Sequence, residues 1–310
     1  MSFKNDKKPL WVDLQINGYG GIDFNTPDLS VDAVKTIVRR LNEDGTAAFL
    51  PTFVTGDPKM VLENIRTIVK ARKLDPVCEK TIIGLHLEGP FISPHLGAVG
   101  THPIEWVVPP SIERFMRYQD AAEGLVKLIT VAAEIPGMSD FVKEVSSNGV
   151  TVSLGHQMAS TKEEIASCIA SGARAFTDLG NGIPNMINRH KNIIFTALTE
   201  DRASIMFIPD GHHLPDEMLK LYVRAVDLKR LIAVSDSQYP AGMAPGKYSV
   251  CGANAVLEEN GLLWNPERNC LVGATTPMAQ MMRLMKERIG LSENECIAIG
   301  RDNPLRLINM

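Results

Sequence analysis

The sequence predicts an α/β protein folded as a (β/α)8 barrel of the TIM type. Eight short apolar segments alternate with helical patterns along the 310 residues, which is the element count of such a barrel. Four of these segments end directly in a side chain that can bind a metal or transfer a proton: Glu88, His156, Asp178 and Asp236. An open doubly wound sheet is the alternative, but its G-x-G-x-x-G turn is missing after the first strand.

The predicted strands are apolar runs bounded by Gly, Pro or polar residues, which is typical of parallel strands buried on both faces. They cover residues 10–16, 47–54, 81–87, 127–133, 151–155, 173–177, 203–208 and 231–235.

The helices between these strands carry their own start and stop signals. Ser30 is placed to cap a helix that Gly45 ends. Asp57-Pro58 opens the next helix, with proline at the first helical position. Thr276-Pro277 opens a methionine-rich helix that ends at Gly290.

We predict a single domain over residues 1–310, with one insertion. Residues 238–275 break the alternation, because they contain short apolar strands around an Asn260-Gly261 turn. This segment is predicted to be a hairpin excursion after strand eight. It is either a lid over the site or a surface elaboration.

Composition narrows the class of protein. The net charge is -4 and no basic block occurs, so nothing favours binding to nucleic acid or to an anionic membrane. No apolar run reaches the ~20 residues of a membrane span. Five cysteines are scattered without C-x-x-C spacing, and the segment Met1–Lys8 is polar. We therefore expect a cytoplasmic protein with reduced thiols.

Three of the strand-end residues form a candidate metal site. Glu88, His156 and Asp178 offer two carboxylates and one imidazole, a set that suits Zn, Fe(II), Mn or Co with a position left for water. Each residue alone is more often a hydrogen-bonded structural group. The metal hypothesis therefore depends on the barrel bringing the three together.

Two further residues are candidates for catalysis. Asp236 is suited to act as general base towards water beside a metal and then as general acid towards a leaving amine. Its alternative role is to cap the loop after strand eight. His102, in the loop after strand three, is suited to polarise a carbonyl oxygen. Its alternative is an ordinary solvated histidine.

Two basic segments are candidates for binding an anion. Arg189 lies among Asn188, His190 and Lys191, and its guanidinium fork suits a phosphate or carboxylate; a solvated basic loop is the alternative. His212 and His213 are adjacent, so at most one of them is expected to face the site.

The motifs taken together resemble the N-acetylglucosamine-6-phosphate deacetylases of the amidohydrolase superfamily. The likeness runs from Trp11–Gly21 to Asn303–Asn309 and is specific in the order and spacing of its pieces. These pieces are His86–Pro90, Gly100–His102, Gly155-His156, Leu179–Pro184, Asp210–His213, Ser235-Asp236 and Pro240–Gly242.

The resemblance implies a function and a set of roles. The enzyme would remove the acetyl group from an N-acetylated amino sugar phosphate, with N-acetylglucosamine 6-phosphate as the expected substrate. Glu88 and His156 would be metal ligands, Asp236 the acid/base, and His102 the residue that polarises the acetyl carbonyl. Asn181 and Gly182 would contact the substrate. Arg189 and His213 would bind the phosphate, with His213 supplied by the neighbouring subunit of a homodimer.

The residues at the end of the first strand indicate how many metal ions the site holds. Many metal-dependent hydrolase barrels have a His-x-His pair at its end, where this chain has Gln15 and Asn17. Because neutral amides are weak ligands, we expect one divalent ion, and we count Gln15 and Asn17 among the candidate substrate-binding residues.

The chain departs from the family pattern at two places. Asp178 stands where the family has a histidine ligand, which would shift metal preference from Zn towards Fe, Mn or Mg. Both segments of the family's small β-sandwich are also missing from the 310 residues, which is consistent with a bare barrel. Two alternatives stay open: an amidohydrolase acting on another N-acyl or cyclic amide, and a metal-free sugar-phosphate-binding protein without turnover.

Overall fold

The structure is a computed structural model that describes residues 10–158 and 162–310. The polar N-terminal segment Met1–Lys8 lies outside the described residues.

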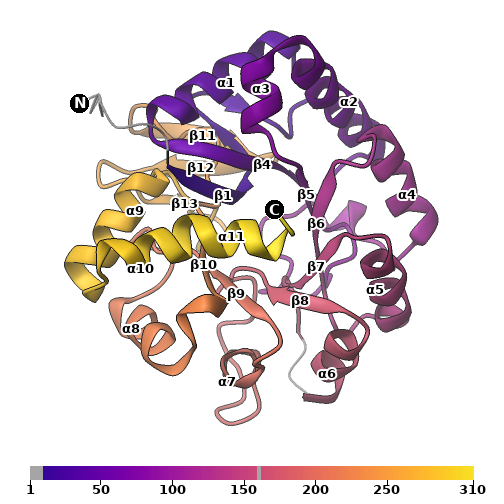
Figure 1. The fold of residues 1–310 in the computed structure, drawn as a ribbon, viewed down its shortest axis with the longest axis vertical. Helices are drawn as coiled ribbons and strands as arrows, with labels where there is room; N and C mark the ends of the chain where they lie inside the picture. Colours follow the sequence, from indigo (N-terminus) through magenta and orange to yellow (C-terminus); the bar gives the residue numbers. More distant parts are fainter. Residues whose placement is uncertain (1–9, 159–161) are drawn as a thin grey trace.

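Eight parallel strands form one sheet that curls into a ring (Figure 1). The strands pair in chain order, and a parallel bridge from Ile16 to Ser237 joins the first strand to the segment after the last one. The predicted barrel is confirmed. Its strands are β1 Trp11–Ile16, β4 Thr46–Val54, β5 Leu85–Glu88, β6 Val126–Val131, β7 Thr151–Leu154, β8 Ala173–Phe176, β9 Ser204–Phe207 and β10 Leu231–Ala233.

Helices surround the ring and cover its outer face (Figure 1). They are α1 Val31–Glu43, α2 Pro58–Leu74, α3 Pro76–Thr81, α4 Ile112–Ala121, α5 Met138–Ser147, α6 Lys162–Ala170, α7 Ile193–Thr199, α8 Asp216–Ala225, α9 Met278–Leu284, α10 Glu293–Ile297 and α11 Asn303–Leu307. None of the helices within the described ranges is long and apolar enough to cross a membrane.

Local capping explains where the helices begin. The Ser30 side chain accepts from the backbone N–H of Ala33 at 3.2 Å and starts α1, as the sequence predicts. Asp57 starts α2 in the same way, with Pro58 at the first turn. The predicted strand 81–87 is too long, because β5 begins only at Leu85. The missed start signal Asp75-Pro76 opens α3, which ends at Thr81, and Ile82 forms only an isolated bridge to Phe49.

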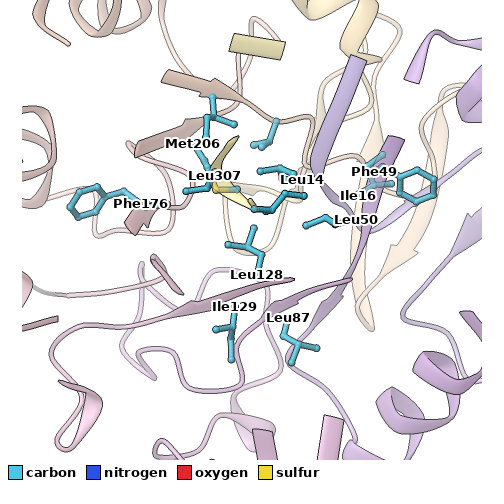
Figure 2. Close-up of a cluster of buried hydrophobic side chains, with 14 of the residues drawn as sticks. Leu14, Ile16, Phe49, Leu50, Leu87, Leu128, Ile129, Phe176, Met206 and Leu307 are labelled. Carbon is cyan, nitrogen blue, oxygen red and sulfur yellow. The ribbon is translucent and has the colours of Figure 1, made fainter. Parts of the chain in front are cut away.

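The C-terminal helix α11 closes the end of the barrel at which the strands begin. In Figure 1 its yellow ribbon crosses the ring and brings the C-terminus towards the centre. The Asn303 amide donates to the carbonyls of Leu228 and Leu231 at 2.7 Å each, and the Thr151 hydroxyl donates to the carbonyl of Leu307 at 3.0 Å. Figure 2 shows Leu307 among the buried side chains towards the middle of the ring. The opposite end stays available for chemistry.

The predicted excursion after strand eight is present as a small sheet rather than a single hairpin. Its four antiparallel strands are β11 Gly246–Val250, β12 Ala253–Leu257, β13 Leu263–Asn265 and β14 Cys270–Leu271. Val250, Leu257 and Leu263 belong to its own apolar cluster. The sheet is tied to the carboxyl end of the barrel, since Ala274 N–H donates to the Asp236 carbonyl at 2.9 Å and Arg268 donates to the Gly100 carbonyl at 3.1 Å.

Candidate functional site

The carboxyl ends of the strands bring four of the predicted residues together. Glu88 ends β5, while His156, Asp178 and Asp236 follow β7, β8 and β10. Glu88 Oε1 lies 2.9 Å from His156 Nε2, and Asp178 Oδ2 lies 4.0 Å from the same nitrogen. The amide of Gln15, on β1, joins Glu88, Asp178 and Asp236 by hydrogen bonds. The convergence on which the metal hypothesis depends is therefore present.

A shared backbone conformation directs three of these side chains. His156, Asp178 and Asp236 have φ angles of 50°, 50° and 48°, in the left-handed region that residues other than glycine seldom adopt. Each is positioned where a parallel strand gives way to a loop. Such conformations persist only where the surrounding structure enforces them, and they concentrate at functional sites.

The hydrogen bonds of His156 fix its tautomer. Its Nδ1 lies 2.8 Å from the carbonyl oxygen of Ala98, which can only accept, so Nδ1 carries a proton. Nε2 therefore faces Glu88. Burial alone would lower the pKa of His156, but its hydrogen bond to Glu88 and the charges of Glu88 and Asp178 raise it to about 9. A proton on Nε2 is held there by two carboxylates.

Asp178 is buried, and only one of its two carboxylate oxygens accepts a hydrogen bond from a described residue. Its Oδ2 accepts from Gln15 Nε2 at 3.0 Å, while its Oδ1 has no hydrogen-bond partner among the described residues. Burial raises the pKa of Asp178, and the negative charge of Glu88 raises it further. The positive charge of His156, whose Nε2 is 4.0 Å away, lowers the pKa of Asp178 only in part, so the ionised form stays incompletely compensated.

Asp236 receives its partners from the first strand. Asn17 Nδ2 donates to Asp236 Oδ1 at 2.6 Å and Gln15 Nε2 donates to the same oxygen at 3.4 Å. Burial raises the pKa of Asp236 well above its ordinary value, and the charges of Asp178 and Glu88 add to the effect. Burial and the two neighbouring carboxylates thus favour the protonated form of Asp236 over the ionised one.

His102 lies against the same cluster. Its ring centroid is 4.4 Å from that of His156, and the donor atoms of Glu88, His102 and His156 lie within 4.8 Å of one another. The backbone N–H of Thr55 donates to His102 Nδ1 at 3.3 Å. Burial lowers the pKa of His102 to about 3, so the ring is neutral and carries its proton on Nε2. That tautomer can donate a hydrogen bond but has no free lone pair for a metal.

Two candidate substrate residues lie in the loop after β8. The backbone N–H of Asn181 donates to the Asp178 carbonyl at 2.7 Å, and its side-chain Nδ2 is buried without a partner among the described residues. Gly182 has a φ of 61°, and a Cβ there would stand 3.3 Å from His156 Nδ1. Glycine allows this loop to pass closely over the imidazole.

Arg189 is not brought to the carboxylate cluster. It is exposed in the loop after β8 and has no hydrogen bond or ion pair to any described residue. A cavity of about 200 Å³ opens along this loop, and its lining includes Lys191 but neither Arg189 nor any residue of the carboxylate cluster. The rest of the lining comprises Gln157, Met158, Ile183, Pro184, Met186, Ile187, Asn188, Asn192 and Ile193.

The two adjacent histidines diverge, as the sequence predicts. His212 Nε2 lies 3.2 Å from the Asn260 carbonyl, in the turn between β12 and β13. His213 Nδ1 lies 2.8 Å from Asp210 Oδ2, and its side chain is 5% exposed. The charge of His213 lowers the pKa of Asp178 slightly, after larger effects from burial, Glu88, His156 and Gln15. This position favours a role in its own subunit; the cross-subunit role stays a prediction.

Several residues that support the site were not predicted. Asp210 orients His213, and the Ala98 carbonyl orients His156. Below Glu88, His86 Nε2 lies 2.8 Å from Thr130 Oγ1, and a chain of hydroxyls continues from Thr130 to Thr177. Alternation along β5 places His86 on the same face as Glu88, which is the signal that could have found it. The carbonyl partner of His156 has no sequence signal.

Comparison with known proteins confirms the resemblance that the motifs predict, although no protein-family model matches the chain. The N-acetylglucosamine-6-phosphate deacetylase of Bacillus subtilis (strain 168) is 29% identical over 305 residues, covering 97% of this chain and 75% of the relative. The N-acetylgalactosamine-6-phosphate deacetylase of Escherichia coli O157:H7 is 24% identical over 303 residues, covering 97% and 78%.

The solved structures contain the same fold. A mutant of N-acetyl-D-glucosamine-6-phosphate deacetylase from Mycobacterium smegmatis, in complex with N-acetyl-D-glucosamine-6-phosphate, superposes with a TM-score of 0.88. Its sequence identity is 23%, and the alignment covers 98% of this chain and 78% of that one. At this identity the likeness establishes the barrel.

Proposed function

We propose that this protein is a metal-dependent deacetylase that releases acetate from an N-acetylated amino sugar 6-phosphate. The observation that carries the proposal is the arrangement of His156, whose Nε2 faces Glu88 and Asp178 while Nδ1 is fixed by a backbone carbonyl. This is how a histidine that ligates a metal is normally oriented. The names of the curated relatives supply the reaction and the substrate class.

The donor set fits a divalent cation. Asp178 Oδ1 is unpartnered, and the carboxylates of Glu88, Asp178 and Asp236 carry more negative charge than the single imidazolium of His156 can balance. Glu88, His156 and Asp178 would hold the ion, and Zn, Fe and Mn all suit one imidazole and two carboxylates. When bound, such an ion supplies the Lewis acidity that activates water and polarises an amide carbonyl.

The other residues supply proton transfer and orientation. His102 would donate from Nε2 to the acetyl oxygen as negative charge develops there. Asp236 would take a proton from the attacking water, and would return it to the amine nitrogen as the C–N bond breaks. Acetate and the free amino sugar phosphate are the products. Asn17, 2.6 Å from Asp236 Oδ1, would hold the carboxylate in place for both transfers.

Substrate binding and assembly complete the proposal. Asn181 and Gly182 would contact the sugar, and Arg189 and His213 would bind the phosphate. A homodimer is inferred from the family resemblance. Cytoplasmic location is inferred from five free cysteines, three of which (Cys78, Cys168 and Cys296) are buried.

The epimeric substrate is the second candidate. One of the two curated relatives described above is named for the galactosamine compound. Acetate release should be measured with N-acetylglucosamine 6-phosphate and N-acetylgalactosamine 6-phosphate, together with bound metal per chain. Turnover of either compound with about one metal per chain supports the proposal. A folded protein that binds a sugar phosphate without metal or acetate release would support the inactive-binding alternative.

A further inference from the structure

Gln15 is the one residue of the described chain whose side chain contacts three site carboxylates. Its Nε2 lies 3.0 Å from Asp178 Oδ2, 3.4 Å from Glu88 Oε1 and 3.4 Å from Asp236 Oδ1. The side chain is fully buried. An amide nitrogen has two protons, so it cannot satisfy three acceptors fully, and the shortest contact identifies Asp178 as the main partner.

The backbone of Gln15 is fixed from two sides. Its N–H donates to Asp13 Oδ1 at 3.1 Å, and its carbonyl accepts from the Ser235 hydroxyl at 3.3 Å. Asp13 Oδ1 also accepts from the backbone N–H of Ser235 at 3.1 Å. These contacts join the first strand to the segment after the last strand. The amide is therefore presented to the carboxylates by the closure of the barrel itself.

We propose that Gln15 is a positioning residue, which gathers the three carboxylates and engages Asp178 Oδ2 so that Asp178 Oδ1 is left to face a cation. Two observations carry this inference: the three contacts of Nε2, and the buried, unpartnered Asp178 Oδ1. The inference rests on the proposed metal-dependent function. It replaces the substrate-binding role that the sequence suggested for Gln15.

The same geometry explains how an aspartate can stand at position 178. An aspartate adds a negative charge close to Glu88, and like charges at short range repel strongly when they are buried. A neutral amide donor reduces this cost without adding a ligand. Gln15 and Asp178 should therefore behave as one coupled pair.

The first test measures metal binding. Gln15→Met removes the donor while keeping an unbranched side chain, and Gln238→Met is the matched control. Gln238 is also buried at this end of the barrel, but it has no hydrogen bond to the three carboxylates in the part of the chain that the structure describes. Affinity for Zn²⁺ and Mn²⁺, measured by chelator competition, should fall ~10–100-fold in Gln15→Met, as for other residues that orient metal ligands. The control should stay within about twofold.

The second test needs no metal and no turnover. Urea unfolding of the metal-free protein should be measured for wild type, Gln15→Met, Asp178→Asn and the double variant. A coupled pair gives effects on the unfolding equilibrium constant that deviate from additivity by at least about threefold. Additive effects would overturn the proposal. So would unchanged or tighter metal binding by Gln15→Met, because the amide would then be irrelevant to the ion or in competition with it.

The two tests separate this inference from the proposed function. A wild-type protein that binds no metal and releases no acetate would remove the proposed function and, with it, the cation-facing role of Asp178. The unfolding cycle would still decide whether Gln15 holds Asp178. A protein that is active with metal but shows no coupling would retain its function and lose the role given to Gln15.

Discussion

His156 and Ala98 are joined by a contact of 2.8 Å between the imidazole Nδ1 and a backbone carbonyl oxygen. The residue after β7 is thereby oriented by the loop after β5, and the same loop carries His102. Because the carbonyl fixes the proton on Nδ1, the lone pair of Nε2 becomes available once its own proton is lost. The site can exchange that proton for a metal without turning the ring.

A substitution of Asp178 gives the most direct test of the metal hypothesis. Asp178→Ala should strip the metal, because it removes the third ligand. A metal titration of the purified variant measures this. Asp227→Ala is the control, since Asp227 is a carboxylate whose Oδ1 accepts from the Lys229 backbone N–H outside the site. If Asp178→Ala binds metal with undiminished stoichiometry and affinity, Asp178 is not a ligand and only accepts hydrogen bonds from the loop.

Placing a histidine at position 178, as in the family pattern, tests metal preference. Asp178→His replaces a hard, anionic oxygen with a borderline nitrogen, so selectivity should move towards Zn and away from Fe and Mn. Competition between Zn²⁺ and Mn²⁺ on wild type and variant measures the shift. An unchanged ratio would mean that residue 178 does not touch the ion.

Asp236 can be tested by removing only its ability to transfer a proton. Asp236→Asn should lower kcat by ~10²–10⁴-fold, the usual cost of losing a general acid–base group. Metal content and the urea midpoint should remain close to wild type, because the amide keeps the shape of the side chain. Wild-type kcat in this variant would make Asp236 structural.

The anion site requires a comparison of two basic residues. Arg189→Ala should raise KM for the phosphorylated sugar by about one to two decades, from the loss of a charge-assisted pair worth ~1.5–3 kcal/mol. KM for the unphosphorylated sugar should change little. Lys191→Ala is the comparison variant, because Lys191 lines the cavity that Arg189 does not. An effect confined to Lys191→Ala would move phosphate recognition to that residue.

The sequence predicts the barrel well because hydrophobic burial and chain alternation are local signals. The predicted strands end within a few residues of the observed ones, and Ser30 and Asp57 start helices as expected. Strand ends also placed Glu88, His156, Asp178 and Asp236 correctly, because parallel strands point their carboxyl ends to one side. The prediction failed at 81–84, because α3 extends to Thr81 and β5 begins only at Leu85.

The remaining parts of the site depend on contacts between segments far apart in the chain. The Gln15–Asp178 pair spans 163 positions, and no pattern around either residue indicates it. The carbonyl that orients His156 belongs to Ala98, whose side chain is irrelevant to the contact. Such relationships follow from the closed ring and from loop geometry, which single-sequence patterns do not encode.

The far end of the barrel offers a test of the fold that leaves the site untouched. Asn303→Ala should lower the free energy of unfolding by about 2 kcal/mol, because it removes a buried amide that donates to the carbonyls of both Leu228 and Leu231. Urea unfolding measures the loss. Asn148→Ala is the matched control: Asn148 is exposed, has a φ of -85°, and its side chain donates one hydrogen bond to the Glu144 carbonyl at 2.8 Å, so its removal should cost less than about 0.5 kcal/mol. Because α11 covers the end opposite to Glu88 and His156, kcat of folded Asn303→Ala should equal that of wild type. Equal stability of the two variants would mean that water replaces the Asn303 amide and that α11 is not held by it.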